Sequence, residues 1–379
     1  MHKASTWAWR ALAGVAALLL LAIGALAWPL PVWRTGQTPL PDLQYLPAQT
    51  AATATTAATP PAQAARVWVD ADAACGSGRH RDPDDCLALL SLALAQDFTL
   101  VGISTVFGNA PVVETDAVTH ALVQALVQQT RLRGEPRLPI FRGCAAAAPR
   151  CLDRGGSAAA QDALVAALQA GALEVVALGP LSNLAAVLAR DPALAGRITR
   201  VVAVMGRRPG HRFHPSENRG VGAMLFGHGP IFRDLNAGLD PQAVAAILRA
   251  RIPLVLVPYT AARQVLLSGA DLDAIAATGL AGRWVASRSR DWLEFWRTEA
   301  GLPGFYPFDL MAAAYLREPS RFRCARVSAW VGEDALLPWF GGGPTLLVAQ
   351  HALPPAAVDG AGTALYCDGA DVRIASLFK

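Results

Sequence analysis

Arg66–Asp72 (RVWVDAD) and Asp82–Ala95 (DPDDCLALLSLALA) are the stretches that decide the fold. The first is a short β-branched and aromatic run, typical of a buried strand, and it ends in aspartates. The second begins with acidic residues and continues as an apolar helix. Further strands are expected at 99–105, 174–178, 200–205 and 254–257, and helices at 84–95, 112–128, 158–170, 183–190 and 241–250. This alternation predicts an α/β fold: a Rossmann-like, open, mostly parallel sheet with helices on both faces.

The composition excludes several classes of protein. Of the 379 residues, 53% are hydrophobic and 16% are charged, which argues against a mainly disordered chain. The net charge is only +4 and no run of Lys or Arg stands out, so no nucleic-acid partner is expected.

The N-terminal segment has the pattern of a membrane anchor or a signal peptide. Residues 11–28 are uncharged, strongly apolar and about long enough to cross a bilayer, and Lys3 and Arg10 precede them. We therefore expect residues 1–28 to form a transmembrane helix that anchors the chain, with the remainder outside the cytoplasm. The alternative is a signal peptide cleaved after Ala25-Leu26-Ala27, which would make the protein secreted.

The anchor and the folded domain are separated by a segment of low complexity. Residues 29–65 contain seven Pro, and residues 49–59 are only Gln, Thr and Ala. Such a segment predicts a linker, which leaves 66–379 as the domain.

All six cysteines lie in that domain, at positions 75, 86, 144, 151, 324 and 367. An exported domain can form disulfides, and the close spacings favour Cys75 with Cys86 and Cys144 with Cys151, which leaves Cys324 for Cys367. Free buried thiols are the alternative.

The loop after the first strand is unusually acidic. Asp70, Asp72, Asp82, Asp84 and Asp85 fall within 16 residues, at the edge of the sheet where ligands bind in such folds. Carboxylates packed together repel one another, and a hard cation such as Ca²⁺ or Mg²⁺ would remove that repulsion. Helix capping and a solvated acidic loop form the alternative explanation.

Other polar residues follow the later strands or begin helices. Alone, each is explained as a turn, a helix cap or a surface residue. They are Asn109, Ser182, His228, Asp234, Asn236 and Asp309.

Taken together and in order, these residues resemble the inosine–uridine-preferring nucleoside hydrolase family. The resemblance covers about residues 66–320, and its motifs are D-x-D (70–72), D-D (84–85), TVFGN (105–109), LGPLSN (178–183), DLN (234–236) before Asp240-Pro241, and the late Asp309. It implies hydrolysis of the N-glycosidic bond of a ribonucleoside through water activated by calcium (Ca²⁺) and an oxocarbenium-like transition state.

The resemblance also assigns roles to residues. It implies that Asp72, Asp85, Asp309 and the Ser182 carbonyl hold Ca²⁺, and that Asp72 takes a proton from the water. By the same comparison Asp84, Asn109, Asp234 and Asn236 bind ribose hydroxyls, and His228 lies near the 5′-hydroxyl. Family members often form dimers or tetramers, so a homo-oligomer is a further expectation, although nothing in the sequence marks an interface.

Two departures from the family pattern keep an alternative open. Asp72 and Asp84 are twelve positions apart, further than is usual in the family, and Phe308 stands where purine-cleaving members have a histidine that protonates the leaving base. His80, His211, His214 and Tyr306 are candidates for that acid. The alternative function is a protein of the same fold that binds ribosides or other sugars without turnover, or that acts on a different substrate.

Overall fold

A computed structural model describes residues 42–47, 64–76, 81–130, 138–151, 158–209, 234–333, 343–350 and 360–379, with Leu19 and Gly78 as single residues. The expected anchor at 1–28, except for Leu19, and His228 lie outside the described residues, as do His80, His211 and His214. Among the helices that are described, none is both long enough and apolar enough to cross a membrane.

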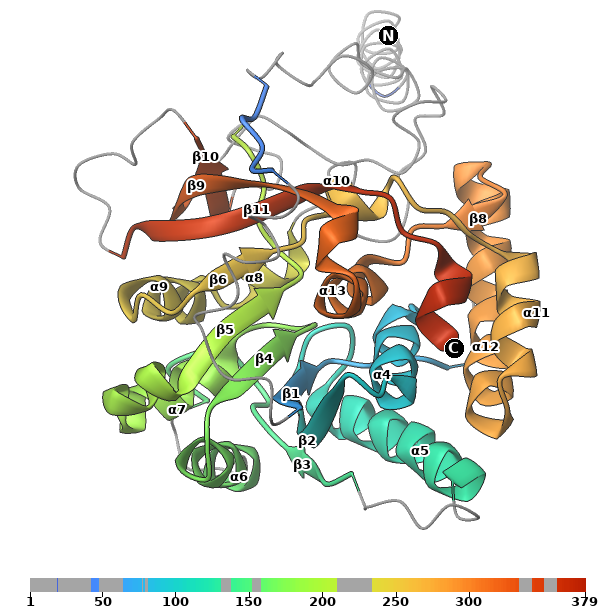
Figure 1. Ribbon diagram of the computed structural model, residues 1–379, viewed down its shortest axis with the longest axis horizontal. Helices are drawn as coiled ribbons and strands as arrows, with labels where there is room; N and C mark the ends of the chain where they lie inside the picture. The colour runs from blue at the N-terminus through green and yellow to red at the C-terminus, as the bar shows by residue number, and fades with distance from the viewer. Residues whose placement is uncertain are drawn as a thin grey trace, which may run out of the picture.

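A nine-stranded sheet forms the centre of the molecule, in the order β10-β9-β11-β6-β5-β4-β1-β2-β3 (Figure 1). Its strands are β1 (Ala65–Ala71), β2 (Phe98–Thr105), β3 (Ile140–Arg142), β4 (Leu173–Ala177), β5 (Ile198–Ala203), β6 (Leu254–Leu256), β9 (Phe322–Glu333), β10 (Pro344–Ala349) and β11 (Gly362–Ala370). Strands β1 to β6 pair in parallel, and β11 is parallel to β6. The predicted mostly parallel sheet is therefore confirmed.

Three strands that were not expected from the sequence, β9, β10 and β11, extend the sheet past β6. There β9 pairs antiparallel with both β10 and β11. A separate two-stranded sheet joins β7 (Leu267–Ser268) to β8 (Gly304–Phe305).

Helices cover both faces of the sheet. They are α4 (Asp84–Leu94), α5 (Val112–Thr130), α6 (Ala158–Gln169), α7 (Ser182–Arg190), α8 (Leu235–Leu239), α9 (Pro241–Arg249), α10 (Tyr259–Ala262), α11 (Gly269–Ala277), α12 (Leu280–Phe295) and α13 (Phe308–Arg317). The five helices expected from the sequence occur within one or two residues of their predicted bounds, as do the five strands.

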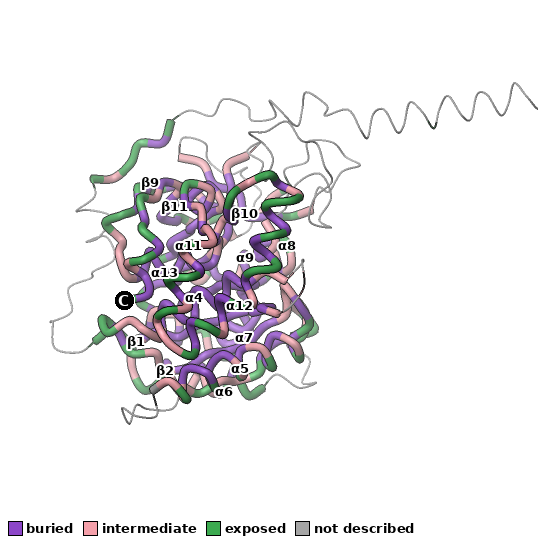
Figure 2. The backbone as a smooth tube through the Cα atoms, turned by 90° about the vertical axis from the view of Figure 1, so that its right-hand side faces the viewer, coloured by how far each residue is buried: buried purple, intermediate pink, exposed green. Residues whose placement is uncertain are grey.

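Strand β1 shows why the sheet needs both helical layers. Successive side chains of a strand point to opposite faces. Val67 and Val69 belong to the hydrophobic cluster formed with α4, α5, α12 and α13, whereas Trp68 belongs to the cluster formed with α6, α7 and α9. Figure 2 shows this buried interior enclosed by exposed outer helix faces. A strand buried on both faces holds the acidic residues that follow it in a fixed position.

All three expected disulfides are present: Cys75–Cys86, Cys144–Cys151 and Cys324–Cys367. The free-thiol alternative is wrong. Cys324 and Cys367 are directly opposite each other on β9 and β11.

Part of the predicted linker lies against the domain. The Leu46 amide donates to the Cys324 carbonyl (2.8 Å), and Leu43 is buried in the cluster of α6, α7 and α9.

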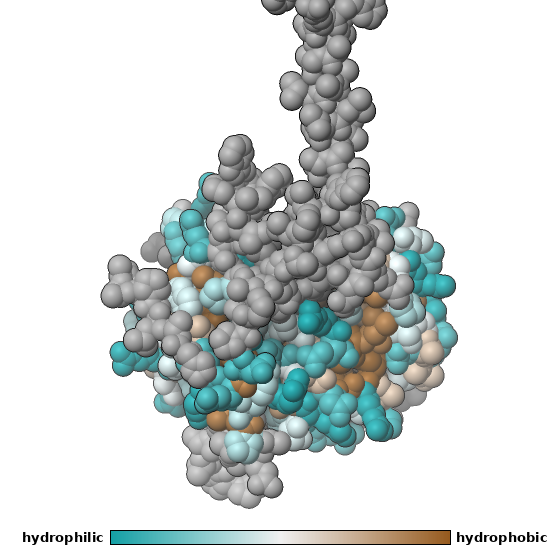
Figure 3. All heavy atoms as spheres, turned by 90° about the horizontal axis from the view of Figure 1, so that it is seen from above, coloured by the Kyte–Doolittle hydropathy of each residue, from teal (hydrophilic) through white to brown (hydrophobic). Residues whose placement is uncertain are grey.

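Figure 3 shows one face of the molecule, on which hydrophilic residues surround a smaller hydrophobic strip. The homo-oligomer stays a prediction.

Candidate active site

The parallel strands bring their carboxyl ends, and the residues that follow them, to one edge of the sheet. Backbone hydrogen bonds continue past the strands: the Val106 amide donates to Ala71 O (3.0 Å) and the Leu178 amide to Asp70 O (2.8 Å). The loops after β1, β2 and β4 are therefore neighbours. Asp72, Asn109 and Gly179 come together although over 100 residues separate the first from the last.

Three carboxylates converge from two helix starts. Asp84 and Asp85 open α4, Asp309 lies in the first turn of α13, and one oxygen of each lies within 4.8 Å of the others. All three residues are buried. The Asp309 amide donates to Asp84 Oδ2 (3.1 Å), which fixes the two helix starts against each other.

Asp72 joins this group through Asn109. The Asn109 amide donates to Asp72 Oδ2 (2.8 Å), and the Asn109 Nδ2 donates to Asp85 Oδ2 (3.1 Å). The Asp72 amide donates to Asp85 Oδ1 (3.1 Å). Asn109 is therefore more than a turn residue, because it aligns two carboxylates of the cluster.

Two glycines allow the backbone to pass close to Asp72. A Cβ added at Gly108 would lie 1.7 Å from Asp72 Oδ2, and one added at Gly179 would lie 2.9 Å from Asp72 Cγ. Both positions belong to the motifs singled out in the sequence, TVFGN and LGPLSN. The requirement for glycine follows from this close approach.

Burial and mutual repulsion disfavour the charged forms of these carboxylates. Loss of water raises the pKa of Asp72 and Asp309 well above the ordinary 3.8, and the charges of neighbouring aspartates raise both further. Burial and the charge of Asp84 raise the pKa of Asp85 to about 7. The cluster is therefore costly to ionise without a compensating cation.

The donor set fits a hard divalent cation. Within the described part of the chain, the donors that converge here are carboxylate oxygens, which Ca²⁺ and Mg²⁺ prefer. Oxygens bound to one Ca²⁺ at about 2.4 Å lie at most about 5 Å apart, which the spacing of Asp84, Asp85 and Asp309 meets. This group consists of Asp84, Asp85 and Asp309, and Asp72 lies beside it. The predicted ligand set of Asp72, Asp85 and Asp309 stays a prediction.

Ser182 makes its contacts elsewhere. Its hydroxyl donates to Asp240 Oδ2 (2.6 Å), and the Cys151 sulfur lies 3.7 Å from its carbonyl oxygen. Within the LGPLSN motif, the backbone that lies next to Asp72 is that of Gly179. The carbonyl ligand assigned to Ser182 stays a prediction.

Asp234 and Asn236 lie at the ends of β4 and β5. Asp234 caps α8 by accepting from the Ala237 amide (3.1 Å) and also accepts from the Gly206 amide (2.6 Å). Burial raises the pKa of Asp234 to about 6. Asn236 Nδ2 donates to the carbonyls of Leu178 and Val204. The contact of Asp234 and Asn236 with ribose hydroxyls stays a prediction.

Sequence reasoning missed a buried polar network under the site. Asp70 Oδ1 accepts from Ser104 Oγ and from Asn183 Nδ2, each at 2.7 Å. Asn183 Oδ1 accepts a hydrogen bond from the Cys144 amide (2.8 Å), and Asn183 Nδ2 also donates to the Thr105 carbonyl (3.0 Å). The signal was present, because Asp70 and Asn183 both belong to the quoted motifs. The network ties together the loops that carry Asp72, Asn109 and Gly179.

Aromatic residues lie beside Asp309. Tyr306 packs edge-on against Trp296 (5.0 Å between ring centroids) and against Phe308 (6.4 Å), and both Tyr306 and Phe308 are partly exposed. No ionisable side chain occupies position 308, next to the acidic cluster.

Fold and site together define an α/β enzyme class that places buried carboxylates for a hard cation at the carboxyl edge of a parallel sheet. The model of the inosine-uridine preferring nucleoside hydrolase family matches residues 67–337, and the chain belongs to that family. It is therefore a glycosyl hydrolase that acts on ribonucleosides.

Curated relatives agree with this assignment. The chain is 25% identical over 256 residues to the non-specific ribonucleoside hydrolase RihC of Salmonella agona, an alignment that spans 63% of this chain and 76% of the relative. It is 25% identical over 215 residues to the pyrimidine-specific ribonucleoside hydrolase RihA of Salmonella enteritidis, spanning 56% of this chain and 62% of the relative.

Solved structures show the same fold. A plant nucleoside hydrolase superposes with a TM-score of 0.63 at 18% identity, over 83% of this chain and 98% of the other. A purine-preferring ribonucleoside hydrolase from Gardnerella vaginalis gives a TM-score of 0.59 at 20% identity, over 83% and 99% of the two chains.

Proposed function

We propose that the chain uses Ca²⁺ to cleave the N-glycosidic bond of ribonucleosides, giving ribose and the free base. The observation that carries this proposal is the convergence of Asp84, Asp85 and Asp309, with Asp72 held beside them by Asn109. When bound, the cation would supply Lewis acidity toward a water molecule and toward the vicinal hydroxyls of ribose.

Asp72 is the residue assigned to accept the proton from water. Its carboxylate is held by the Asn109 amide and enclosed between Gly108 and Gly179, so its oxygens cannot move far. A base that is fixed in this way loses little entropy on reaching the transition state.

The remaining anionic side chains stabilise charge on the sugar. Cleavage of an N-glycosidic bond develops positive charge on the ribose ring, as in other glycoside hydrolysis. Asp84, which is buried, and Asp234, which is partly exposed, lie at the same edge of the sheet, and both are assigned to ribose hydroxyls. Preorganised negative groups around a developing cation lower the barrier.

Position 308 bears on the choice of base. Phe308 cannot donate a proton to a departing purine, whereas the ring can pack against a flat base through its face. We therefore propose that nucleosides whose base can leave without a proton from residue 308 are cleaved faster than purine nucleosides. The two Salmonella relatives, of which RihA is pyrimidine-specific and RihC is non-specific, are compatible with this order.

We also propose that the domain lies outside the cytoplasm, anchored by residues 1–28 or released after their cleavage. Three disulfides support this location, because disulfides persist in oxidising compartments. This location is tested by adding protease to intact spheroplasts and measuring whether the domain is protected, both for protein that keeps the N-terminal segment and for protein from which it has been cleaved.

The test of the activity is ribose release. Full-length protein treated with chelator is incubated with a panel of purine and pyrimidine ribonucleosides, with and without added Ca²⁺. We expect Ca²⁺-dependent release of ribose, and none from the Asp72→Asn variant. Calorimetric nucleoside binding with no ribose released from any member of the panel would instead favour the riboside-binding alternative, which the absence of an acid at position 308 motivates.

A further inference from the structure

The loop between β1 and α4 is closed by a disulfide immediately beside the acidic cluster. Cys75 follows Asp72 by three residues, and Cys86 directly follows Asp85. Along the chain, 12 residues separate Asp72 from Asp85, whereas the path through the sulfur atoms passes only residues 73–75 and Cys86. The covalent bond therefore makes a long loop behave as a short one between these two carboxylates.

Resting on the proposed function, we propose that the Cys75–Cys86 disulfide is a positioning device for the cation site, which holds Asp84 and Asp85 at binding distance from Asp309 when no cation is bound. Both cysteines are buried, and Cys86 packs in the same hydrophobic cluster as α4 and α13. The bond thus connects the carboxyl end of β1 directly to the packed start of α4.

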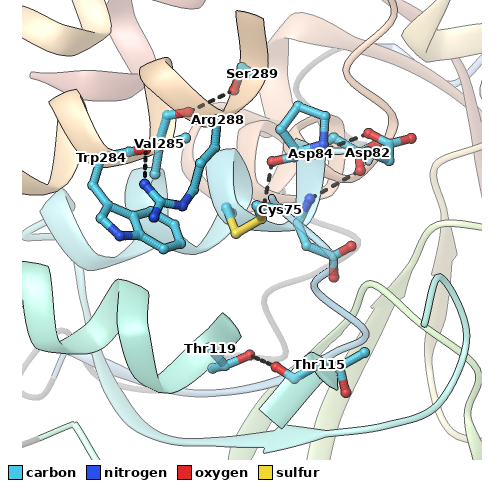
Figure 4. The surroundings of a disulfide bond; sticks show 12 residues. Cys75, Asp82, Asp84, Thr115, Thr119, Trp284, Val285, Arg288 and Ser289 are labelled. Carbon is cyan, nitrogen blue, oxygen red and sulfur yellow. Dashed lines mark hydrogen bonds between the residues drawn. A yellow bond between two sulfur atoms is a disulfide. The ribbon is translucent and has the colours of Figure 1, made fainter. Parts of the chain in front are cut away.

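The loop is also tied to two neighbouring helices. The Gly78 amide donates to Asp291 Oδ2 of α12 (2.7 Å), and Arg81 forms a salt bridge with Glu114 of α5. Figure 4 shows Cys75 with Asp82 and Asp84 on one side, Trp284 and Arg288 of α12 nearby, and Thr115 and Thr119 of α5 opposite. The Asp84 amide is held by Asp82 Oδ1 (3.2 Å), so this loop also sets the orientation of the first turn of α4.

Electrostatics explain why such a constraint is needed. The carboxylates of the cluster repel one another, and a free loop of this length would let α4 begin further from Asp309. Each cation would then have to bring the carboxylates together again, at a cost in conformational freedom. A preformed arrangement avoids that cost and binds the cation more tightly.

The test compares two double variants that each remove one buried disulfide. Cys75→Ala/Cys86→Ala opens the β1–α4 loop, and Cys324→Ala/Cys367→Ala, which opens the bond between β9 and β11, is the matched control. Ca²⁺ affinity is measured by calorimetry, and kcat is measured as a function of Ca²⁺ concentration. We expect about 10- to 100-fold weaker Ca²⁺ binding in the first variant, kcat close to wild type at saturating Ca²⁺, and wild-type affinity in the control.

Equal Ca²⁺ affinity in wild type and the loop variant, or equal weakening in both variants, overturns the inference. If the loop variant does not fold, Cys75→Ser/Cys86→Ser removes the same bond with side chains of closely similar size; weaker Ca²⁺ binding is then expected, and unchanged affinity overturns the inference. Because Ca²⁺ binding is measured without substrate, a wild-type protein that binds Ca²⁺ but releases no ribose would overturn only the proposed function. A wild-type protein that binds no Ca²⁺ would overturn both.

Discussion

Gly108 offers the sharpest test of how Asp72 is positioned. In the Gly108→Ala variant, the new Cβ would lie 1.7 Å from Asp72 Oδ2 and 2.7 Å from Asp72 Cγ, whereas real Cβ atoms essentially never approach another heavy atom closer than 3.0 Å. Either the Asp72 carboxylate or the backbone of the loop must therefore move by more than an ångström. Such a movement also breaks the hydrogen bond from the Asn109 amide to Asp72 Oδ2.

The expected loss of activity follows from that displacement. A reacting group misplaced by about 1 Å costs on the order of 100-fold in rate. We therefore expect kcat/KM for ribonucleoside hydrolysis to fall at least about 100-fold in Gly108→Ala at saturating Ca²⁺. Gly179→Ala should lose less, because its Cβ would lie 2.9 Å from Asp72 Cγ and 2.8 Å from Val106 Cγ1.

The matched control is Gly196→Ala. A Cβ at Gly196 meets no heavy atom within 4 Å, so this variant should keep the wild-type kcat/KM and melting temperature. Steady-state kinetics on the three variants, with circular dichroism to verify folding, separates a local effect from a general one. Wild-type kcat/KM in a folded Gly108→Ala protein would refute the assignment of Asp72 as the positioned base.

Further predictions concern the cation, the pH and the buried network. Asp309→Asn should weaken Ca²⁺ binding by about 10- to 100-fold in calorimetry, and unchanged binding would remove Asp309 from the site. Without Ca²⁺, the free energy of unfolding should fall as the pH rises from 4 to 7. Burial raises the pKa of Asp70 to about 7 and the pKa of Asp234 to about 6, above the ordinary 3.8. Between pH 3.8 and these values, each acid is protonated in the folded protein and ionised in the unfolded chain, so raising the pH favours unfolding. Asp234 alone accounts for about 2 kcal/mol of that loss, which chemical denaturation in chelator at pH 4 and pH 7 measures; a flat profile contradicts it. Asn183→Ala should destabilise the domain by about 2–4 kcal/mol, because it removes donors and an acceptor from buried partners, and a loss below about 0.5 kcal/mol would show that water replaces them.

The central sheet could be predicted from the sequence because its signals are local. Arg66–Asp72 and Glu174–Leu178 are short apolar runs between helical stretches, and both are strands in the structure. Strand β9 was missed because Arg323, Arg326 and Ser328 interrupt its apolar residues, so it forms no continuous apolar run. Local patterns detect buried parallel strands more readily than such mixed ones.

The candidate site could be predicted only in part. The acidic residues of the first loop follow from position along the chain, but the contact of Asp309 with Asp84 joins residues 225 positions apart. The family resemblance placed Asp309 with Asp72 and Asp85, and not with Asp84. Ser182 shows the limit of a motif. Its place at the start of α7 was expected, whereas its hydroxyl bond to Asp240 depends on how α7 packs against α9.

The cation site and the stability of the domain are coupled through the same carboxylates. Burial raises the pKa of Asp72, Asp85 and Asp309, so ionising them in the absence of a cation opposes folding. The packing of β1 and α4 in the hydrophobic cluster opposes this effect and keeps the carboxylates together. A ligand that binds only the folded state stabilises it in proportion to the logarithm of its concentration above Kd. Ca²⁺ should therefore raise the melting temperature at pH 8, where the acids are ionised, and have little effect at pH 4, where protons already occupy them.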